Sequence, residues 1–193
     1  NGATSEDLSD IGAGTYSVLA TDENGCSVSI EVEITEAEAM AISETHSNYT
    51  GYGVSCNGAS DGSIYVTVTG GTGNYTYTWM AGSAMMGTSE QIVDATSEDI
   101  DGLPAGMYSV TATDENGCSV SIDVEITESE AMAISETHSD YTGYGVSCNG
   151  ASDGSIDVTV TGGTGNYTYS WMAGSAMMGT SEDVDGLPAG MYS

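Results

Sequence analysis

Carboxylates are the residues of this sequence with the clearest capacity for chemistry. The 193 residues include 29 Asp and Glu but no Lys or Arg, so the formal net charge is -29. Oxygen ligands suit Ca²⁺, which makes calcium one hypothesis, although no loop has EF-hand spacing. We favour the alternative of a solvated anionic surface screened by diffuse cations. The candidate ligands form two acidic stretches: Glu31, Glu33, Glu36 and Glu38, and then Asp123, Glu125, Glu128 and Glu130.

Catalytic residues are harder to find in this sequence. The only histidines are His46 and His138, and a lone surface His is more often inert than catalytic. The sequence contains no nucleophile elbow, paired-carboxylate motif or zinc signature. We therefore expect that the protein is not an enzyme.

The charge balance also limits the partners. A chain without cations cannot follow a phosphate backbone or bind anionic lipid through a basic patch, which argues against nucleic acid and membrane surfaces. No apolar stretch is long enough to span a membrane, and no signal peptide opens the chain, which begins at Asn1 and looks like part of a longer processed protein. Because 39% of the residues are apolar, we expect folded domains rather than disorder.

An internal repeat organises the chain. The hexapeptide TDENGC occurs at residues 21–26 and 113–118, and VSCNG occurs at 54–58 and 146–150, in both cases 92 residues apart. A unit of this length is a domain in itself rather than a solenoid repeat. We therefore expect the end of one repeat in residues 1–37, a complete repeat in 38–129 and a truncated one in 130–193.

Alternating residues predict β-strands in the complete repeat. From Ser63 to Thr69, Ile64, Val66 and Val68 lie on one face, with Tyr65 and the threonines on the other. Similar alternation predicts strands over 75–79, 108–113 and 119–126, with a leading strand near 40–42. The Asn-Gly turn at 116–117 predicts a hairpin between two of them. Short strands and frequent turns favour an all-β fold, and specifically tandem immunoglobulin-like β-sandwiches.

Aromatic residues fit that fold. The segment from Leu103 to Tyr108, repeated at 187–192, resembles a tyrosine corner, in which the Tyr hydroxyl bonds back to the preceding turn. We favour core packing for Trp79, Trp171, Tyr108 and Tyr192. Exposed aromatics are the candidates for binding a glycan or a surface: Tyr49, Tyr52 and Tyr65.

The four cysteines fall two to a repeat, and they lack metal-type spacing such as C-x-x-C. We favour a disulfide between Cys56 and Cys118 in an oxidising compartment, with the partners of Cys26 and Cys148 outside the printed chain. Two alternatives stay open: the pairs Cys26 to Cys56 and Cys118 to Cys148, or bridges between repeats through residues outside the chain. In a standard immunoglobulin topology, Cys118 and Cys56 would lie toward opposite ends of the sandwich.

The order of short motifs resembles one known family. Cys-x-Gly, Asp-Gly-Ser, Gly-Gly-Thr-Gly, Tyr-x-Tyr-x-Trp, Ala-Gly-x-Tyr and Asp-x-Asn-Gly-Cys follow one another in the complete unit. This series resembles the SprB repeat of Bacteroidetes cell-surface proteins, named for the gliding-motility adhesin. The usual Pro after Gly-Gly-Thr-Gly is Asn74 here, and the loop at 51–53 is expanded. The resemblance implies a long, secreted, surface-anchored filamentous protein used in adhesion or gliding.

These observations favour a structural role. We expect the shaft or spacer of an extracellular bacterial filament or adhesin, because near-identical repeats set length by their number. The rival hypothesis is a module that binds glycans or a surface. A third is lateral assembly of several chains into a fibre through the outward Thr and Tyr rows. The expected partners are thus other copies of the repeat, with a surface or glycan as the rival, and no nucleic acid or membrane insertion.

Overall fold

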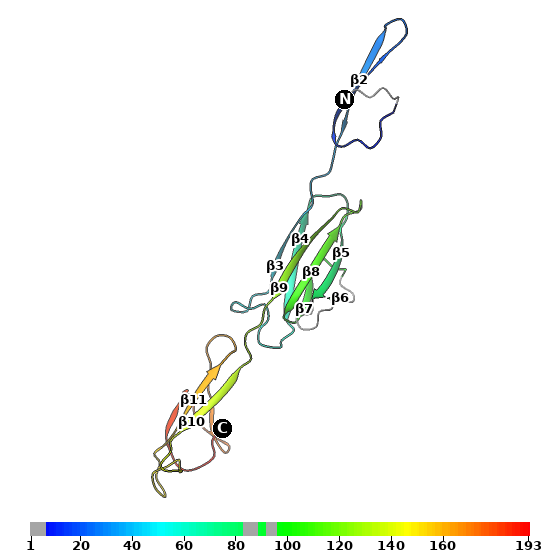
Figure 1. Ribbon diagram of the computed structural model, residues 1–193. Coiled ribbons are helices and arrows are strands. Elements are labelled where there is room, and N and C mark those ends of the chain that lie inside the picture. The colour runs from blue at the N-terminus through cyan, green and yellow to red at the C-terminus, as the bar shows by residue number, and fades with distance from the viewer. Residues whose placement is uncertain (1–6, 83–88, 92–95) are drawn as a thin grey trace.

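The computed structural model describes residues 7–82, 89–91 and 96–193, and over these residues the chain is all-β, with several small sheets and no helix. No helix long and apolar enough to cross a membrane occurs in these ranges. Three parts follow one another along an extended chain: an N-terminal segment up to residue 37, a central segment (38–129) and a C-terminal segment (130–193) (Figure 1).

The central segment contains two antiparallel sheets. Their strand orders are β3-β4-β7 and β6-β5-β8-β9. The strands are β3 (Ala41–His46), β4 (Gly62–Thr69), β5 (Thr76–Gly82), β6 (Ser89–Gln91), β7 (Ile100–Leu103), β8 (Gly106–Thr113) and β9 (Ser119–Ile126).

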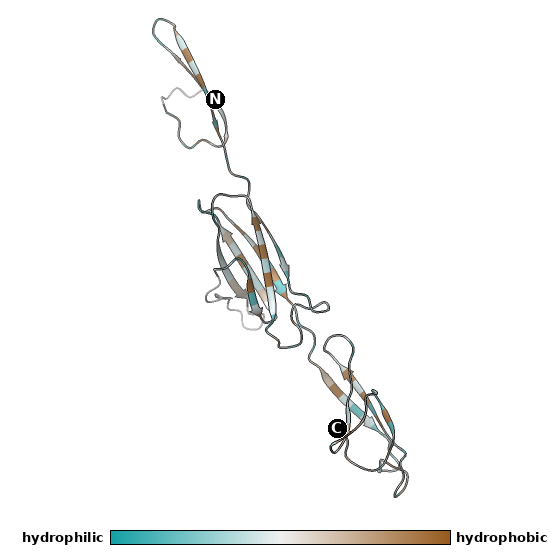
Figure 2. Ribbon diagram, turned by 180° about the vertical axis from the view of Figure 1, so that it is seen from behind, coloured by the Kyte–Doolittle hydropathy of each residue, from teal (hydrophilic) through white to brown (hydrophobic). Residues whose placement is uncertain are grey.

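Both sheets of the central segment contribute to one core. On β4 the alternation predicted from the sequence is present, since Ile64, Val66 and Val68 are buried while Tyr65 is exposed. The two sheets pack against each other because each presents one apolar face. Bands of apolar residues mark these strands in Figure 2. The core consists of Val54, Ile64, Val66, Trp79, Leu103, Tyr108, Val110, Val124 and Ile126.

Polar atoms of the large aromatic residues have partners. The indole nitrogen of Trp79 donates to the carbonyl oxygen of Ser97 (3.0 Å), and the hydroxyl of Tyr108 donates to the carbonyl oxygen of Pro104 (2.8 Å). The second bond is the one that the tyrosine-corner motif predicts. Trp79 and Tyr108 are buried, as is Trp171 in the C-terminal segment, whereas Tyr192 is half-buried. Burial of these rings is compatible with their polar groups because each polar atom is hydrogen-bonded.

The two outer segments contain parts of the same arrangement. The N-terminal segment holds the hairpin of β1 (Gly14–Thr21) and β2 (Ser27–Ile34), paired from Gly14 with Ile34 to Thr21 with Ser27. In the C-terminal segment, one sheet has the order β10-β11-β14 and a separate hairpin joins β12 to β13. These strands are β10 (Ala133–His138), β11 (Gly154–Thr161), β12 (Trp171–Ala173), β13 (Ala176–Gly179) and β14 (Val184–Leu187).

Candidate functional site at the repeat junctions

At one end of the central segment, a buried carboxylate joins two loops. Asp114 opens the β8–β9 turn and is only 6% exposed. Its Oδ1 accepts hydrogen bonds from the backbone N–H groups of Asn116 and Cys118 (both 2.9 Å), and its Oδ2 accepts from the backbone N–H (2.9 Å) and the hydroxyl (3.1 Å) of Thr72. Burial alone would raise the pKa of Asp114, but these hydrogen bonds favour the charged form and hold the pKa below its ordinary value.

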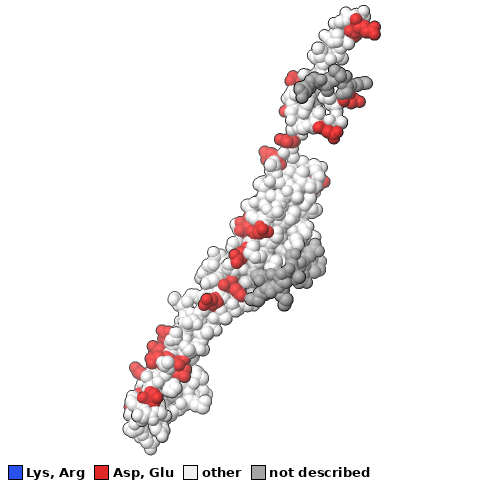
Figure 3. All heavy atoms as spheres, viewed as in Figure 1, with Lys and Arg blue, Asp and Glu red and all other residues white. Residues whose placement is uncertain are grey.

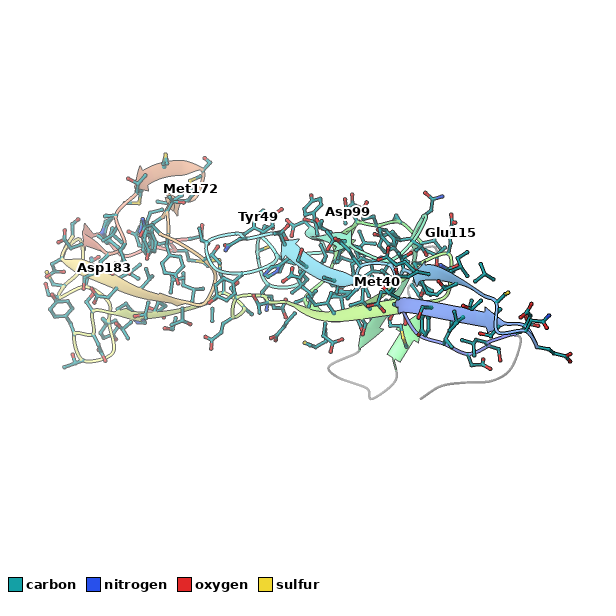
Figure 4. The ribbon with its side chains drawn as sticks, turned by 90° about the horizontal axis from the view of Figure 1, so that it is seen from above. Met40, Tyr49, Asp99, Glu115, Met172 and Asp183 are labelled. Carbon is teal, nitrogen blue, oxygen red and sulfur yellow. The ribbon has the colours of Figure 1, made fainter. Side chains whose placement is uncertain are left out.

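The next two residues of the turn strengthen the same connection. Glu115 Oε1 accepts from the backbone N–H (3.2 Å) and the side-chain amide (3.1 Å) of Asn74. The side-chain amide of Asn116 donates to the Thr72 hydroxyl (2.6 Å). Asp114, Glu115 and Asn116 thus fix the β8–β9 turn to the loop between β4 and β5. Figure 4 shows Glu115 near Met40 at this end of the central segment, with Tyr49 toward the other end.

The chain enters the central segment through this same loop. The backbone N–H of Gly71 donates to the carbonyl oxygen of Glu38 (2.8 Å). Gly70 has a φ of +76°, and a Cβ at this position would lie 2.1 Å from the carbonyl oxygen of Ala39, so only glycine fits. The C-terminal segment repeats the arrangement, with Gly163 donating to Glu130 (2.8 Å) and Gly162 packed against Ala131. Both junctions are therefore built the same way on their C-terminal side.

At the other end, the loop before β4 holds the chain that leaves β9. Backbone N–H groups of Gly53 and Val54 donate to the carbonyl oxygen of Thr127 (2.9 and 3.2 Å). The side-chain amide of Asn57 donates to the carbonyl oxygen of Ser129 (2.8 Å), and the backbone N–H of Gly58 donates to Glu128 Oε2 (2.7 Å). Val54 is fully buried. The departing chain is thus fixed along the loop rather than released at Ile126.

Together these bonds make a continuous connection between the central and C-terminal segments. We call residues 127–130 the linker. Thr127, Glu128 and Ser129 bond to the central segment, and Glu130, the very next residue, bonds to Gly163 of the C-terminal segment. Ser129 is 1% exposed, and its hydroxyl has no hydrogen-bond partner among the described residues. No residue of the linker lacks a bond to one side or the other, so few of its dihedral angles are free to move.

The structure does not contain the Cys56–Cys118 disulfide, and this prediction is wrong. All four cysteines, Cys26, Cys56, Cys118 and Cys148, are free and exposed. Cys56 lies in the loop bonded to Ser129, beyond the end of β9, whereas Cys118 directly precedes β9. The eight residues of that strand separate the two ends by roughly 25 Å at about 3.3 Å per residue, and a disulfide needs Cα atoms within about 7 Å.

The predicted calcium ligands lie along the exposed strands and the linkers. Glu31 and Glu33 are exposed on β2, Asp123 and Glu125 are exposed on β9, and the side chain of Glu128 is bonded to Gly58. Glu36, Glu38 and Glu130 are exposed between strands. Acidic atoms follow the whole length of the chain in Figure 3. Within the described ranges no three His, Cys, Asp or Glu side chains group as a metal site would require. Calcium stays a prediction, to be tested by melting with calcium and with a chelator.

The aromatic residues predicted to bind a ligand are only partly together. Tyr49 and Tyr52 face each other across a β-bridge in the loop after β3, and the Tyr49 hydroxyl donates to the carbonyl oxygen of Asp61 (3.3 Å). Tyr65 lies on the outward face of β4, 52% exposed. The structure thus offers a pair of rings in one loop and a separate ring on the sheet.

Both histidines pair locally with a glutamate. His46 Nδ1 lies 3.0 Å from Glu44 Oε2, and His138 Nδ1 lies 3.0 Å from Glu136 Oε2. The hydrogen bond and the charge of Glu136 raise the pKa of His138 above its ordinary value. In each case the partner is the glutamate two residues earlier on the same strand, so these contacts are local to the surface of β3 and β10.

Sequence reasoning missed the residues that build the junctions. The alternation and turn patterns of the sequence predict a hairpin at Asn116, but they indicate no junction role for Asp114, Thr72 or Asn57. Their only sequence signal is that the motifs containing them recur 92 residues apart in TDENGC, GGTG and VSCNG. Turn residues and junction residues leave the same signal in a sequence, because both occur in short polar motifs between strands.

Comparison with known families identifies two segments of the chain. The SprB repeat model matches residues 54–84 and 146–176, which confirms the resemblance for these segments. Each match runs from the buried Val54, or its counterpart Val146, through β4 or β11 to the strand that carries the core tryptophan. A search of curated proteins found no match to the chain.

The described residues form an all-β chain, and two segments of it match the SprB repeat, a family found in cell-surface proteins. The particular family named by the match is a structural repeat and not an enzymatic one. Nothing in the described residues indicates catalysis.

Proposed function

We propose that this chain is part of the shaft of a long extracellular bacterial filament or adhesin, and that its repeats act as spacers in adhesion or gliding. In this proposal the repeat is an immunoglobulin-like β-sandwich of about 92 residues with boundaries near 38 and 129. Support for the sandwich comes from the two antiparallel sheets that enclose one core and from the Tyr108 hydrogen bond to Pro104.

The observation that carries the shaft proposal is the linker. A shaft must transmit force and keep its length, so neighbouring repeats must not fold back on each other. Three linker residues bond to the segment before them and the fourth bonds to the segment after them. A tether of Gly and Ser without such bonds would behave as a flexible coil instead.

The uniform negative charge supports the same function. Every repeat adds carboxylates without a cation, so neighbouring segments repel one another at low salt and extended arrangements are favoured. Exposed acidic residues are present on both β2 and β9 and in the linkers. Repulsion and the bonded linker therefore act in the same direction.

Small-angle scattering tests this function. We expect the whole chain to scatter as a stiff, extended particle whose maximum dimension changes little with added salt. Asn57→Ala removes the bond to Ser129 and should broaden the distribution of dimensions. The matched control is Asn149→Ala in the C-terminal segment, because Asn149 has the same loop position without a hydrogen bond to the linker. A wild-type profile typical of a flexible chain would contradict the shaft.

Glycan or surface binding is the second candidate, and it rests on Tyr65. This ring is 52% exposed on a sheet face, and Asp157 replaces it at the equivalent position of the C-terminal segment, so folding does not require an aromatic there. Tyr65→Asp should therefore fold normally. If the chain is a binding module, wild type will retain glycans on an array and the variant will lose them. Equal absence of binding in both would remove this candidate.

A further inference from the structure

The first and last strands of the central segment run in the same direction. β3 begins where Glu38 is bonded to the β4–β5 loop, and β9 begins at the turn that Asp114 holds to the same loop. Both strands end at the loop before β4, where the backbone N–H of Gly53 donates to the carbonyl oxygen of Thr127 (2.9 Å). The two strands also lie side by side (Figure 1). The chain therefore enters the central segment at one end and leaves it at the opposite end.

This arrangement fixes how tension along the chain acts on the central segment. Force reaches the start of β3 and the end of β9, and it is directed along both strands. β3 is paired with β4 over all six of its residues, and β9 is paired with β8 over all eight. Hydrogen bonds in an antiparallel ladder are perpendicular to the strands, so a pull along the strands loads every pair at once. The strands must therefore shear past their neighbours rather than separate one pair at a time.

The exit from β9 is tightly packed. Ile126 is 1% exposed and contacts two glycines of the neighbouring chain. A Cβ at Gly53 would lie 2.8 Å from Ile126 Cγ2, and a Cβ at Gly62 would lie 3.0 Å from the same atom. Close-packed side chains give way only when their neighbours move. The end of β9 therefore cannot slide toward the linker without displacing these contacts.

The entry to β3 is packed in a similar way. A Cβ at Gly71 would lie 2.9 Å from Met40 Cγ, so the chain that leads into β3 lies directly on the β4–β5 loop. The C-terminal segment has the same contact, because a Cβ at Gly163 would lie 2.8 Å from Met132 Cγ. Both ends of the load path through the central segment are thus fixed by packing as well as by the backbone ladders.

We propose that the repeat bears tension, and that β3 and β9, with their ladders to β4 and β8, are the mechanical clamp that keeps it folded under load. No covalent bridge assists this clamp, because all four cysteines are free. The inference rests on the shaft function, since a chain that transmits force is the one that needs such a clamp. It goes beyond that function, because a spacer can be stiff at rest and still unfold when it is pulled.

Pulling one protein in two directions is the decisive test. A chain in which the other three cysteines are replaced by serine keeps Cys118 as its single thiol attachment. Handles on Asn1 and Ser193 load the clamp in shear, whereas handles on Asn1 and Cys118 pull at the entry end alone and part the pairs in sequence. We expect a rupture force at least about twofold higher in the first direction, because forced unfolding follows the rate at which the loaded contacts break.

Two variants separate mechanical strength from overall stability. Ile126→Val and Leu103→Val each remove one methylene from the same core, but Ile126 lies on β9 whereas Leu103 lies on β7, outside the load path. Both should lower the melting temperature by similar amounts. At a fixed force along the chain, Ile126→Val should raise the unfolding rate at least about twofold, because its contacts break in the transition state. Leu103→Val should unfold at the wild-type rate.

Equal rupture forces in the two directions would overturn the proposal, as would equal effects of the two variants on the unfolding rate under load. Failure of the clamp is distinct from failure of the shaft, because scattering measures the chain without load. A stiff chain that ruptures equally in both directions keeps the shaft and removes the clamp. A flexible chain with direction-dependent rupture keeps the clamp and removes the shaft.

Discussion

Asp114 and Thr72, which are 42 residues apart in the sequence, are joined by two hydrogen bonds to a single carboxylate oxygen. The same carboxylate closes its own turn through Asn116 and Cys118. One side chain therefore shapes the β8–β9 turn and attaches it to the β4–β5 loop, where the chain enters the central segment. Hydrogen bonds to a charged acceptor are stronger than neutral ones, so this carboxylate should matter for stability.

Replacing Asp114 by Asn should lower the melting temperature of the central segment by several degrees. One oxygen of the amide can still accept from the turn, but the NH₂ group then faces the Thr72 N–H, and two donors cannot bond. Asp22→Asn is the matched control, because the Asp22 carboxylate accepts hydrogen bonds from the backbone N–H groups of Asn24 (2.9 Å) and Cys26 (2.8 Å) within its own turn. Calorimetry should show no shift of the central transition for the control. Equal shifts for both variants would contradict the role of Thr72.

Acid should destabilise the protein through the same kind of carboxylate. The pKa values of Asp61 and Asp153 are lowered by hydrogen bonds from Ser55 and Ser147, and that of Asp114 is lowered as described above. A group with a depressed folded pKa contributes stability above about pH 4, where the unfolded carboxyl is ionised, and that stability is lost as pH falls through the folded pKa. Melting temperature measured against pH should fall in acid, and less steeply for Asp114→Asn. A pH profile unchanged by that substitution would refute this assignment.

Gly70→Ala should destabilise the junction more than a glycine substitution elsewhere. Gly70 and Gly102 have similar φ values, +76° and +69°, but a Cβ at Gly102 meets no described residue within 4 Å. Gly102→Ala should therefore cost only the left-handed backbone penalty of about 1 to 2 kcal/mol. Gly70→Ala adds a collision with the carbonyl oxygen of Ala39. Denaturant unfolding of the two variants separates the backbone penalty, which both share, from the collision with Ala39, which only Gly70→Ala has. Equal losses in the free energy of unfolding would show that the Ala39 contact is unimportant.

Alternation along strands was predictable, whereas the meeting of loops was not. Ile64, Val66 and Val68 face the core as period two requires, because each strand decides its own faces locally. The short β7, which contains Gly102, and the contact between Asp114 and Thr72 depend on residues far apart in sequence. The cysteine prediction failed for the same reason, since two cysteines in one repeat fix no connectivity without the strand order. Cys56 lies beyond the C-terminal end of β9, whereas Cys118 directly precedes the N-terminal end of the same strand.

Four reactive thiols per chain are therefore expected in the unreduced native protein. All four cysteines are exposed, so a thiol reagent should titrate them without denaturant, and intact mass should match four free thiols. The double variant Cys56→Ser with Cys118→Ser should have the same melting temperature as wild type. Loss of a disulfide closing that loop would instead lower the free energy of unfolding by about 4 kcal/mol in the chain-entropy model. The single variants serve as controls, because either one should reduce the thiol count by one without changing stability. Fewer than four thiols, together with a fall in melting temperature on reduction, would restore a bridge and contradict the positions of these residues.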